Sequence, residues 1–115
     1  MWTGDAQVIS GLMSWSNAVT ACTDLVYPDI PDEEYEDWRL PNIKELQSLI
    51  DYSQINPPLP SDHPFVNVGV SYYWTSTTYS NDTEMAWIVN MKDGSIGLGN
   101  KKTDSFYVWP VRGGE

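Results

Sequence analysis

The first half of the chain carries apolar residues at helical spacing, beginning near residue 15. From Trp15 to Val26 apolar side chains recur every three or four positions, which predicts an amphipathic helix. Ser14 or Ser16 can cap its start, and Pro28 ends it. An acidic segment at residues 29–37 follows and is predicted to be a loop.

A second helix is predicted from about Ile43 to Asp51. Pro41 disfavours helical angles at the residue before it, so the helix has to begin after this proline. Asn42 can then accept a hydrogen bond as the cap. Glu45, three residues later, can complete a capping box.

The second half of the chain changes to the two-residue period of β-strands after a proline-rich loop at residues 56–64. Asp93-Gly94 is the strongest hairpin signal, because both central positions of a type I′ turn need a positive φ. Pro110 predicts an edge position or a bulge for the last strand. The strands are expected at residues 72–77, 84–91, 96–101 and 106–112, with a turn at 80–83. This order of elements predicts a single α+β domain over residues 1–115.

Composition limits the classes of function that the chain can serve. The 115 residues have room for one modest core. Sixteen acidic and six basic residues give a net charge of −10, which argues against nucleic acid as a partner. No apolar run approaches the roughly 20 residues that a membrane span needs, and no signal peptide is visible at the start.

Five sequence blocks carry a family resemblance, and they follow one another in order. They are WRLPNIKELQSLID at 38–51, YWTST at 73–77, AWIVN at 86–90, KDG at 92–94 and VWPVRGG at 108–114. Over residues 10–114 the chain resembles the Lcl C-terminal domain family of bacterial collagen-like adhesins. The resemblance implies a C-type lectin-like fold, related to formylglycine-generating enzymes, with two helices packed on a small, mostly antiparallel twisted sheet. It also implies recognition rather than catalysis, extracellular or at the cell surface, within a longer chain.

Candidates for catalysis are few. Cys22 is the only cysteine, so no internal disulfide can form, and its position predicts a small buried residue on the first helix. Members of the family often carry a cysteine in the last block, where this chain has Pro110. His63 is the only histidine, and neither Cys22 nor any serine has a context that suggests a nucleophile with its base. We therefore expect no enzymatic activity and no cofactor.

The charged residues are expected to form a solvated loop and internal ion pairs rather than a metal site. The acidic run at 29–37 offers oxygen atoms that could suit calcium, but it lacks the alternation and central glycine of an EF-hand loop. A solvated loop without metal is the favoured interpretation. Arg39 and Arg112 are expected to pair with carboxylates inside the domain rather than with a ligand.

The chain is rich in aromatic residues, with six tryptophans and seven tyrosines. Core packing is expected for Trp15, Trp38, Trp74 and Trp87. Three other rings lie in polar stretches near the strand ends and are expected to be exposed, as in recognition surfaces, although ordinary surface packing stays open. One of them, Trp109, stands where the family usually has an arginine. The predicted ligand-binding residues are Tyr79, Asn81, Asp82, Glu84, Ser95, Asn100, Tyr107 and Trp109.

The expected function is recognition of a glycan or a protein through the C-terminal strands and loops. Some members of the family are ligand-binding products of diversity-generating retroelements, and the polar residues between the fixed-looking blocks would suit such diversification. The competing interpretation is a structural domain that ends a fibre and forms a homo-oligomer, with the aromatic face against a neighbouring subunit.

Overall fold

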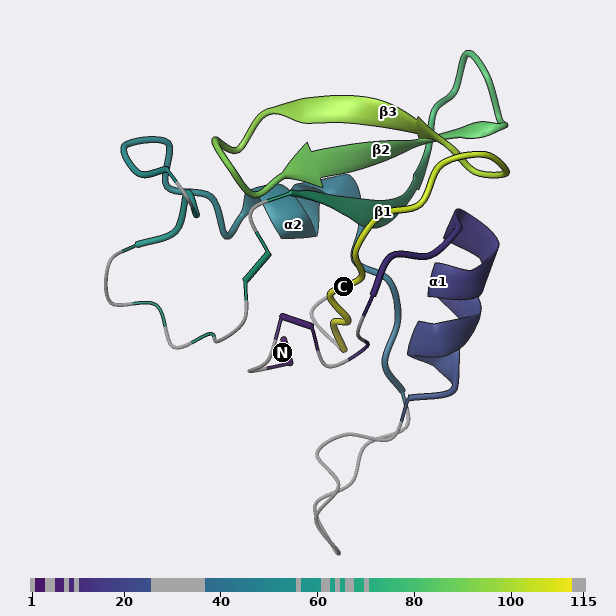
Figure 1. Ribbon diagram of the computed structural model, residues 1–115, viewed down its shortest axis with the longest axis horizontal. Helices are drawn as coiled ribbons and strands as arrows, with labels where there is room; N and C mark the ends of the chain where they lie inside the picture. Colours follow the sequence, from purple (N-terminus) through teal and green to yellow (C-terminus); the bar gives the residue numbers. More distant parts are fainter. Residues whose placement is uncertain are drawn as a thin grey trace, which may run out of the picture.

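The computed structural model describes most of the chain, namely residues 2–3, 6–7, 9, 11–25, 37–55, 57–60, 63, 65, 68–69 and 71–112. Helices α1 (Trp15–Thr23) and α2 (Ile43–Gln47) come first in the sequence. They precede an antiparallel sheet of three strands, β1 (Tyr72–Thr78), β2 (Met85–Asn90) and β3 (Ile96–Asn100), in the spatial order β1-β2-β3 (Figure 1). The predicted α+β class, with two helices and a mostly antiparallel sheet, is therefore confirmed.

Helix α1 begins and ends close to the predicted limits. Ser14 is the N-cap, but its side chain makes no capping hydrogen bond. The helix ends at Thr23, where the Asp24 N–H donates to the Thr20 carbonyl at 2.9 Å. Residues 26–36 lie outside the described part, so the acidic loop predicted at 29–37 is described only at Asp37.

Helix α2 begins with the predicted capping box. The Asn42 side chain accepts from the Glu45 N–H at 2.8 Å, and Glu45 Oε1 accepts from the Asn42 N–H at 2.9 Å. The helix ends at Gln47 rather than at Asp51, because the chain tightens into turns there. The Ile50 N–H donates to Gln47 at 3.0 Å, and the Asp51 N–H donates to Pro58 at 2.7 Å. Because the Asp51 N–H is bonded to Pro58 in the following loop, it does not extend the helix, which therefore ends early.

Strands β1 and β2 carry buried residues on both of their faces. Adjacent residues of a strand point to opposite faces, and Tyr73 and Trp74 are both fully buried. The first core cluster lies on the Tyr73 face and includes Leu46 of α2, Val89, Met91 and Trp109. The second core cluster lies on the Trp74 face and includes Ala18 and Cys22 of α1, Ala86, Ile88 and Val108. The sheet thus separates two apolar layers, and each helix contributes to one of them.

Residues 106–112 run through the middle of the molecule instead of forming a fourth strand at an edge. Tyr107 forms a parallel bridge with Tyr73 of β1, while Phe106 forms an antiparallel bridge with Met13. Further along, Val111 bridges both Trp2 and Arg39. The predicted strand is therefore reduced to isolated bridges, and the edge position, one of the two alternatives that Pro110 predicted, is wrong. Pro110 lies between the bridges at Tyr107 and Val111.

The β2–β3 hairpin is confirmed, but its turn is longer than predicted. The Asn90 N–H donates to the Ser95 carbonyl at 2.8 Å, so residues 91–94 form the loop. Gly94 has a φ of 83°, and its N–H donates to the Asn90 carbonyl at 2.8 Å. The positive φ was predicted correctly, whereas the two-residue type I′ turn was not.

Candidate functional site

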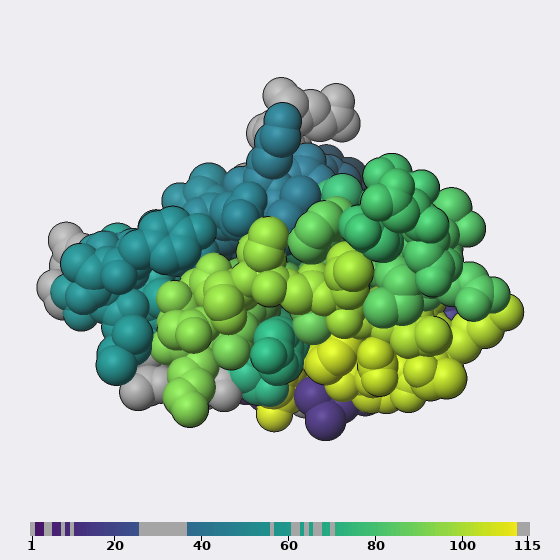
Figure 2. Space-filling view, turned by 90° about the horizontal axis from the view of Figure 1, so that it is seen from above, coloured from purple at the N-terminus to yellow at the C-terminus, as the bar shows by residue number. Residues whose placement is uncertain are grey.

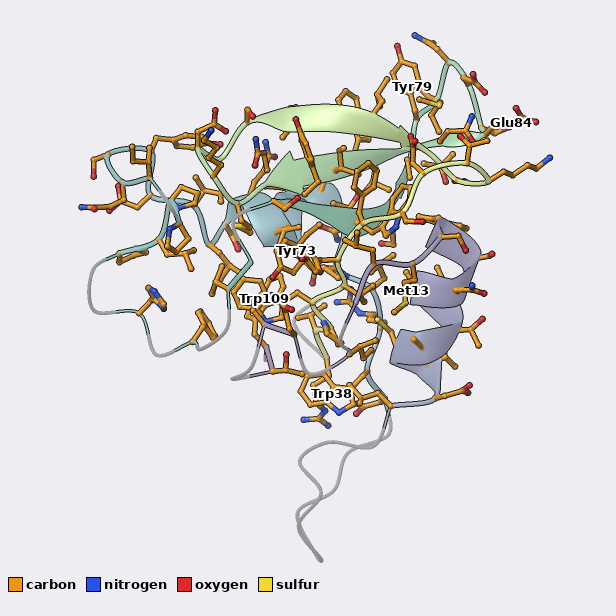
Figure 3. All side chains as sticks on the ribbon, in the orientation of Figure 1. Met13, Trp38, Tyr73, Tyr79, Glu84 and Trp109 are labelled. Carbon is orange, nitrogen blue, oxygen red and sulfur yellow. The ribbon has the colours of Figure 1, made fainter. Side chains whose placement is uncertain are left out.

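The β1–β2 loop, residues 79–84, forms a compact polar turn at one end of the sheet. The Tyr79 N–H donates to Met85 at 2.9 Å, and the Met85 N–H returns to the Asp82 carbonyl at 3.0 Å. The Asp82 side chain accepts from the Glu84 N–H at 3.0 Å. These local bonds hold the loop while Asn81, Asp82 and Glu84 stay exposed. Figure 3 shows Tyr79 and Glu84 in this loop at the end of the sheet. Polar side chains are thereby presented at the surface on a fixed backbone.

An aromatic pair stands beside this turn. The rings of Tyr79 and Trp87 meet edge to face, with centroids 5.4 Å apart at 90°. Both residues are half-buried, and Asn81 Nδ2 donates to the Tyr79 hydroxyl at 3.2 Å. The indole N–H of Trp87 is not buried and has no hydrogen-bond partner among the described residues. By contrast, the indoles of Trp15, Trp74 and Trp109 donate to backbone carbonyls. Trp87 is therefore partly accessible and has an available donor.

The end of β3 adds a basic side to the same surface. Lys102 lies 3.6 Å from Glu84 in an exposed ion pair. Asn100 belongs to the same end of the sheet, because it pairs with Met85, but its side chain supports the backbone. Its Oδ1 accepts from the N–H groups of Lys102 and Thr103 at 2.9 and 3.2 Å. We name the surface formed by Tyr79, Asn81, Asp82, Glu84, Trp87, Asn100 and Lys102 the hairpin-end patch.

Ser95 and Tyr107 lie apart from the hairpin-end patch. Ser95 lies in the β2–β3 turn at the other end of β3, where its N–H donates to Asp93 at 2.9 Å. This bond lowers the pKa of the Asp93 carboxyl. Tyr107 is half-buried against Tyr73, with ring centroids 5.5 Å apart. The structure does not bring either residue together with Tyr79.

The expectation that Trp109 is exposed is wrong. Its ring is fully buried in the first core cluster, and its Nε1 donates to the Thr3 carbonyl at 3.1 Å. The rings of Trp2, Phe65 and Tyr73 surround it at centroid distances of 5.3, 4.9 and 5.9 Å. Figure 3 shows Trp109 beneath the sheet, far from Tyr79 and Glu84. Trp109 therefore offers no surface to a ligand.

The two arginines pair internally, as predicted. Arg39 donates through both Nη atoms to Glu45 at 2.7 Å each, and these bonds lower the pKa of Glu45. Arg112 donates to Asp37 at 2.7 and 3.1 Å and lowers the pKa of that carboxyl. These pairs join the start of α2 and the end of the chain to the segment that precedes α2. They hold the framework rather than a ligand.

Cys22 and His63 show no arrangement for catalysis in the described part of the chain. Cys22 is fully buried, as predicted, and burial raises its pKa to about 12. A thiol with that pKa is almost entirely protonated at neutral pH and is a poor nucleophile. His63 Nδ1 accepts from the Phe65 N–H at 3.2 Å, and the two rings stack. This histidine supports its own loop.

The described residues contain neither a pocket nor a cluster of three or more histidine, cysteine or acidic side chains that could hold a metal ion. None of the described helices is long and apolar enough to cross a membrane. A ligand of this part of the chain would therefore meet an open surface. The sequence pointed to the turn residues of the hairpin-end patch through their turn chemistry. Trp87 was not among the predicted binding residues, because it lies at a strand position that matches the family and was therefore expected in the core.

The family model described as the Lcl C-terminal domain matches residues 1–112, nearly the whole chain. No curated protein and no solved structure gives a significant match.

Proposed function

Because the chain belongs to the Lcl C-terminal domain family, we propose that it is a non-catalytic recognition module of a longer protein. In this proposal the domain has a C-type lectin-like fold and acts at a bacterial surface, in a secreted protein or on a phage. It binds a glycan or a protein through the hairpin-end patch. Of the predicted site residues, Tyr79, Asn81, Asp82, Glu84 and Asn100 stay in the proposal.

The observation that carries the proposal is the pairing of Tyr79 with Trp87 beside a polar turn. A partly exposed indole gives a rigid apolar surface against which a sugar ring or an apolar side chain can pack. Its N–H has no partner within the described residues, and Asn81 and Asp82 supply exposed hydrogen-bonding groups in the turn that contains Tyr79. A stacking face surrounded by polar groups suits a ligand that has both apolar faces and hydroxyl or amide groups.

The fixed geometry of the patch also supports binding. Tyr79 is held by its backbone bond to Met85 and by the Asn81 amide, so its ring is ordered before a ligand arrives. An ordered aromatic side chain loses little entropy on binding. Glu84 and Lys102 are exposed and only loosely paired at 3.6 Å, so both charges are available at low cost.

A glycan array with the folded domain tests the proposal directly. We expect selective binding that Trp87→Ala and Tyr79→Ala abolish. Tyr52→Ala is the matched control, because Tyr52 is an equally aromatic residue, 67% exposed, on the loop after α2. Selective binding that all three variants retain would place the ligand elsewhere. A blank array from folded protein would exclude the glycans displayed and direct the search to protein ligands.

The competing structural role places the same patch between copies of the chain at the end of a fibre. Size-exclusion chromatography with light scattering separates the two roles. A monomer supports ligand binding, whereas a trimer that Trp87→Ala dissociates supports assembly.

A more specific version of the proposal is that a diversity-generating retroelement diversifies the binding residues. This version has its own test. A near-identical template repeat beside the gene, differing at adenines, would support it, and the variable codons should then encode the hairpin-end patch. The absence of such a repeat would refute this form without affecting ligand binding.

A further inference from the structure

The β2–β3 turn contains the dipeptide of this chain that is most prone to rearrange. Asp93-Gly94 is the only place in the sequence where an aspartate or asparagine precedes a glycine. At such a pair the backbone nitrogen of the glycine can attack the side-chain carbonyl carbon of the residue before it. A glycine has no Cβ to hinder that approach. The residues alone therefore mark Asp93 as a site of spontaneous modification.

The rearrangement at Asp93 needs no reactant other than water. The Gly94 nitrogen bonds to Asp93 Cγ, and its proton leaves with the hydroxyl group of the protonated carboxyl as a water molecule. Water then opens the resulting succinimide ring at the Asp93 backbone carbonyl, which gives isoaspartate without a net change in mass. The main chain of the product runs through Cβ and Cγ of residue 93, so it is longer by one carbon atom.

Hydrogen bonds in the folded turn hold both reacting groups. The Gly94 N–H donates to the Asn90 carbonyl at 2.8 Å, so the nitrogen that would attack is engaged. Asp93 Oδ1 accepts from the Ser95 N–H at 2.9 Å, which directs the carboxylate to the residue beyond the glycine. The bond from Ser95 also holds the pKa of the Asp93 carboxyl below its ordinary value, so less of the reactive protonated form is present. Closing the succinimide ring breaks both bonds.

Packing opposes the backbone rotation that would bring the two groups together. Gly94 is buried, with a φ of 83°. An ideal Cβ on Gly94 would lie 2.7 Å from Ile50 Cγ2 and 3.2 Å from Tyr52 Cε1, so these side chains lie directly against the glycine. Figure 2 shows the light-green β2–β3 turn against the teal loop that follows α2. Rotation of the Asp93–Gly94 peptide has to displace these neighbours.

From the two hydrogen bonds and the side chains packed on Gly94, we propose that Asp93 is a latent isoaspartate site, which the native turn protects and which reacts only when the β2–β3 hairpin opens. Isoaspartate at this position prevents the hairpin from closing again. The additional backbone carbon moves the Gly94 N–H away from the Asn90 carbonyl. The modification thus records past openings of the hairpin. It lies at the opposite end of β3 from the hairpin-end patch and does not depend on the function proposed there.

Comparison of native and unfolded protein tests the protection. The protein is incubated at near-neutral pH with and without a denaturing concentration of guanidinium chloride. Samples are digested with a protease that cuts before aspartate but not before isoaspartate, and mass spectrometry gives the uncut fraction at residue 93. We expect isoaspartate to form at least about tenfold more slowly in the native protein, because two hydrogen bonds have to open first. Equal rates in the two samples would overturn the proposal.

The Asp93→Asn variant separates the geometry of the turn from the ionisation of the carboxyl. Its side-chain oxygen can still accept from Ser95, and its amide forms the same succinimide by releasing ammonia, without protonation of a carboxylate. We expect the native variant to lose its amide at least about tenfold more slowly than the unfolded variant, measured by the change in mass. Equal rates here would also overturn the proposal, because the charge of Asp93 would then be the whole cause of its slow reaction.

The effect on the hairpin is measured on protein that has reacted in denaturant and has been refolded. Chromatography separates the molecules with isoaspartate from unmodified molecules taken through the same procedure, which are the matched control. Amide hydrogen exchange at Asn90 and Gly94 should be at least about tenfold faster in the modified molecules, because both N–H groups lose their turn partners. Exchange at the rate of the control would overturn the claim that the hairpin stays open.

Discussion

Replacing Gly99 with alanine is expected to destabilise the domain, because a methyl group does not fit there. An ideal Cβ at Gly99 would lie 2.6 Å from Phe106 Cε2 and 2.8 Å from Trp74 Cζ3. The two rings pack edge to face at 4.9 Å, and Trp74 is fully buried, so neither can move freely. Overpacking of this kind costs about 1–3 kcal/mol. At about 4 °C per kcal/mol for a domain of this size, the melting temperature should fall by about 4–12 °C.

Gly97→Ala is the matched control on the same strand and the same face. A Cβ there would lie 3.6 Å from Ile88 Cγ1, which is ordinary contact. Alanine in a strand interior is more stable than glycine by about 0.5 kcal/mol, so this variant should equal or exceed the original protein. Urea unfolding followed by tryptophan fluorescence measures both variants, and equal m-values would show that stability alone has changed. Equal unfolding free energies for the two variants would refute the packing of Phe106 and Trp74 over β3.

Three further predictions test the core, an ion pair and the thiol. Trp109→Ala should lose about 3–5 kcal/mol of unfolding free energy in urea, because the buried ring also donates to Thr3, and an unchanged midpoint would contradict its burial. The Arg39 bonds hold the pKa of Glu45 below its ordinary value of about 4.5, so the pair stabilises the fold above that pH. The difference in melting temperature between the original protein and Glu45→Gln should therefore shrink as the pH falls below about 4, whereas a constant difference would show that the charge contributes nothing. Burial raises the pKa of Cys22 to about 12, so a thiol reagent at neutral pH should label it only as fast as the domain opens; immediate labelling would contradict this.

Local chemistry explains the features that the sequence predicted correctly. The capping box of Asn42 and Glu45 involves residues three positions apart, so its bonds need no distant partner. The positive φ of Gly94 and the polar turn at 80–83 likewise follow from the residues themselves. The turn residues of the hairpin-end patch could be predicted for the same reason.

Features that depend on distant contacts could not be predicted in this way. Trp109 was expected at the surface because its neighbours in sequence resemble a strand end, yet Thr3 and Phe65 enclose it. Trp87 was expected in the core, yet it lies half-buried beside Tyr79. A two-residue period shows which side chains share a face, but not how much of that face another segment covers.

The sequence by itself determined the α+β class, the starts of the helices, the strand order along the chain and the family, because these rest on local spacing and on ordered sequence blocks. Tertiary structure alone decided that residues 106–112 run between β1 and the segments at Met13 and Arg39, and that the edge of β3 stays open. Strand neighbours are chosen by the burial of apolar area summed over distant segments. A candidate surface is then whatever that burial leaves uncovered.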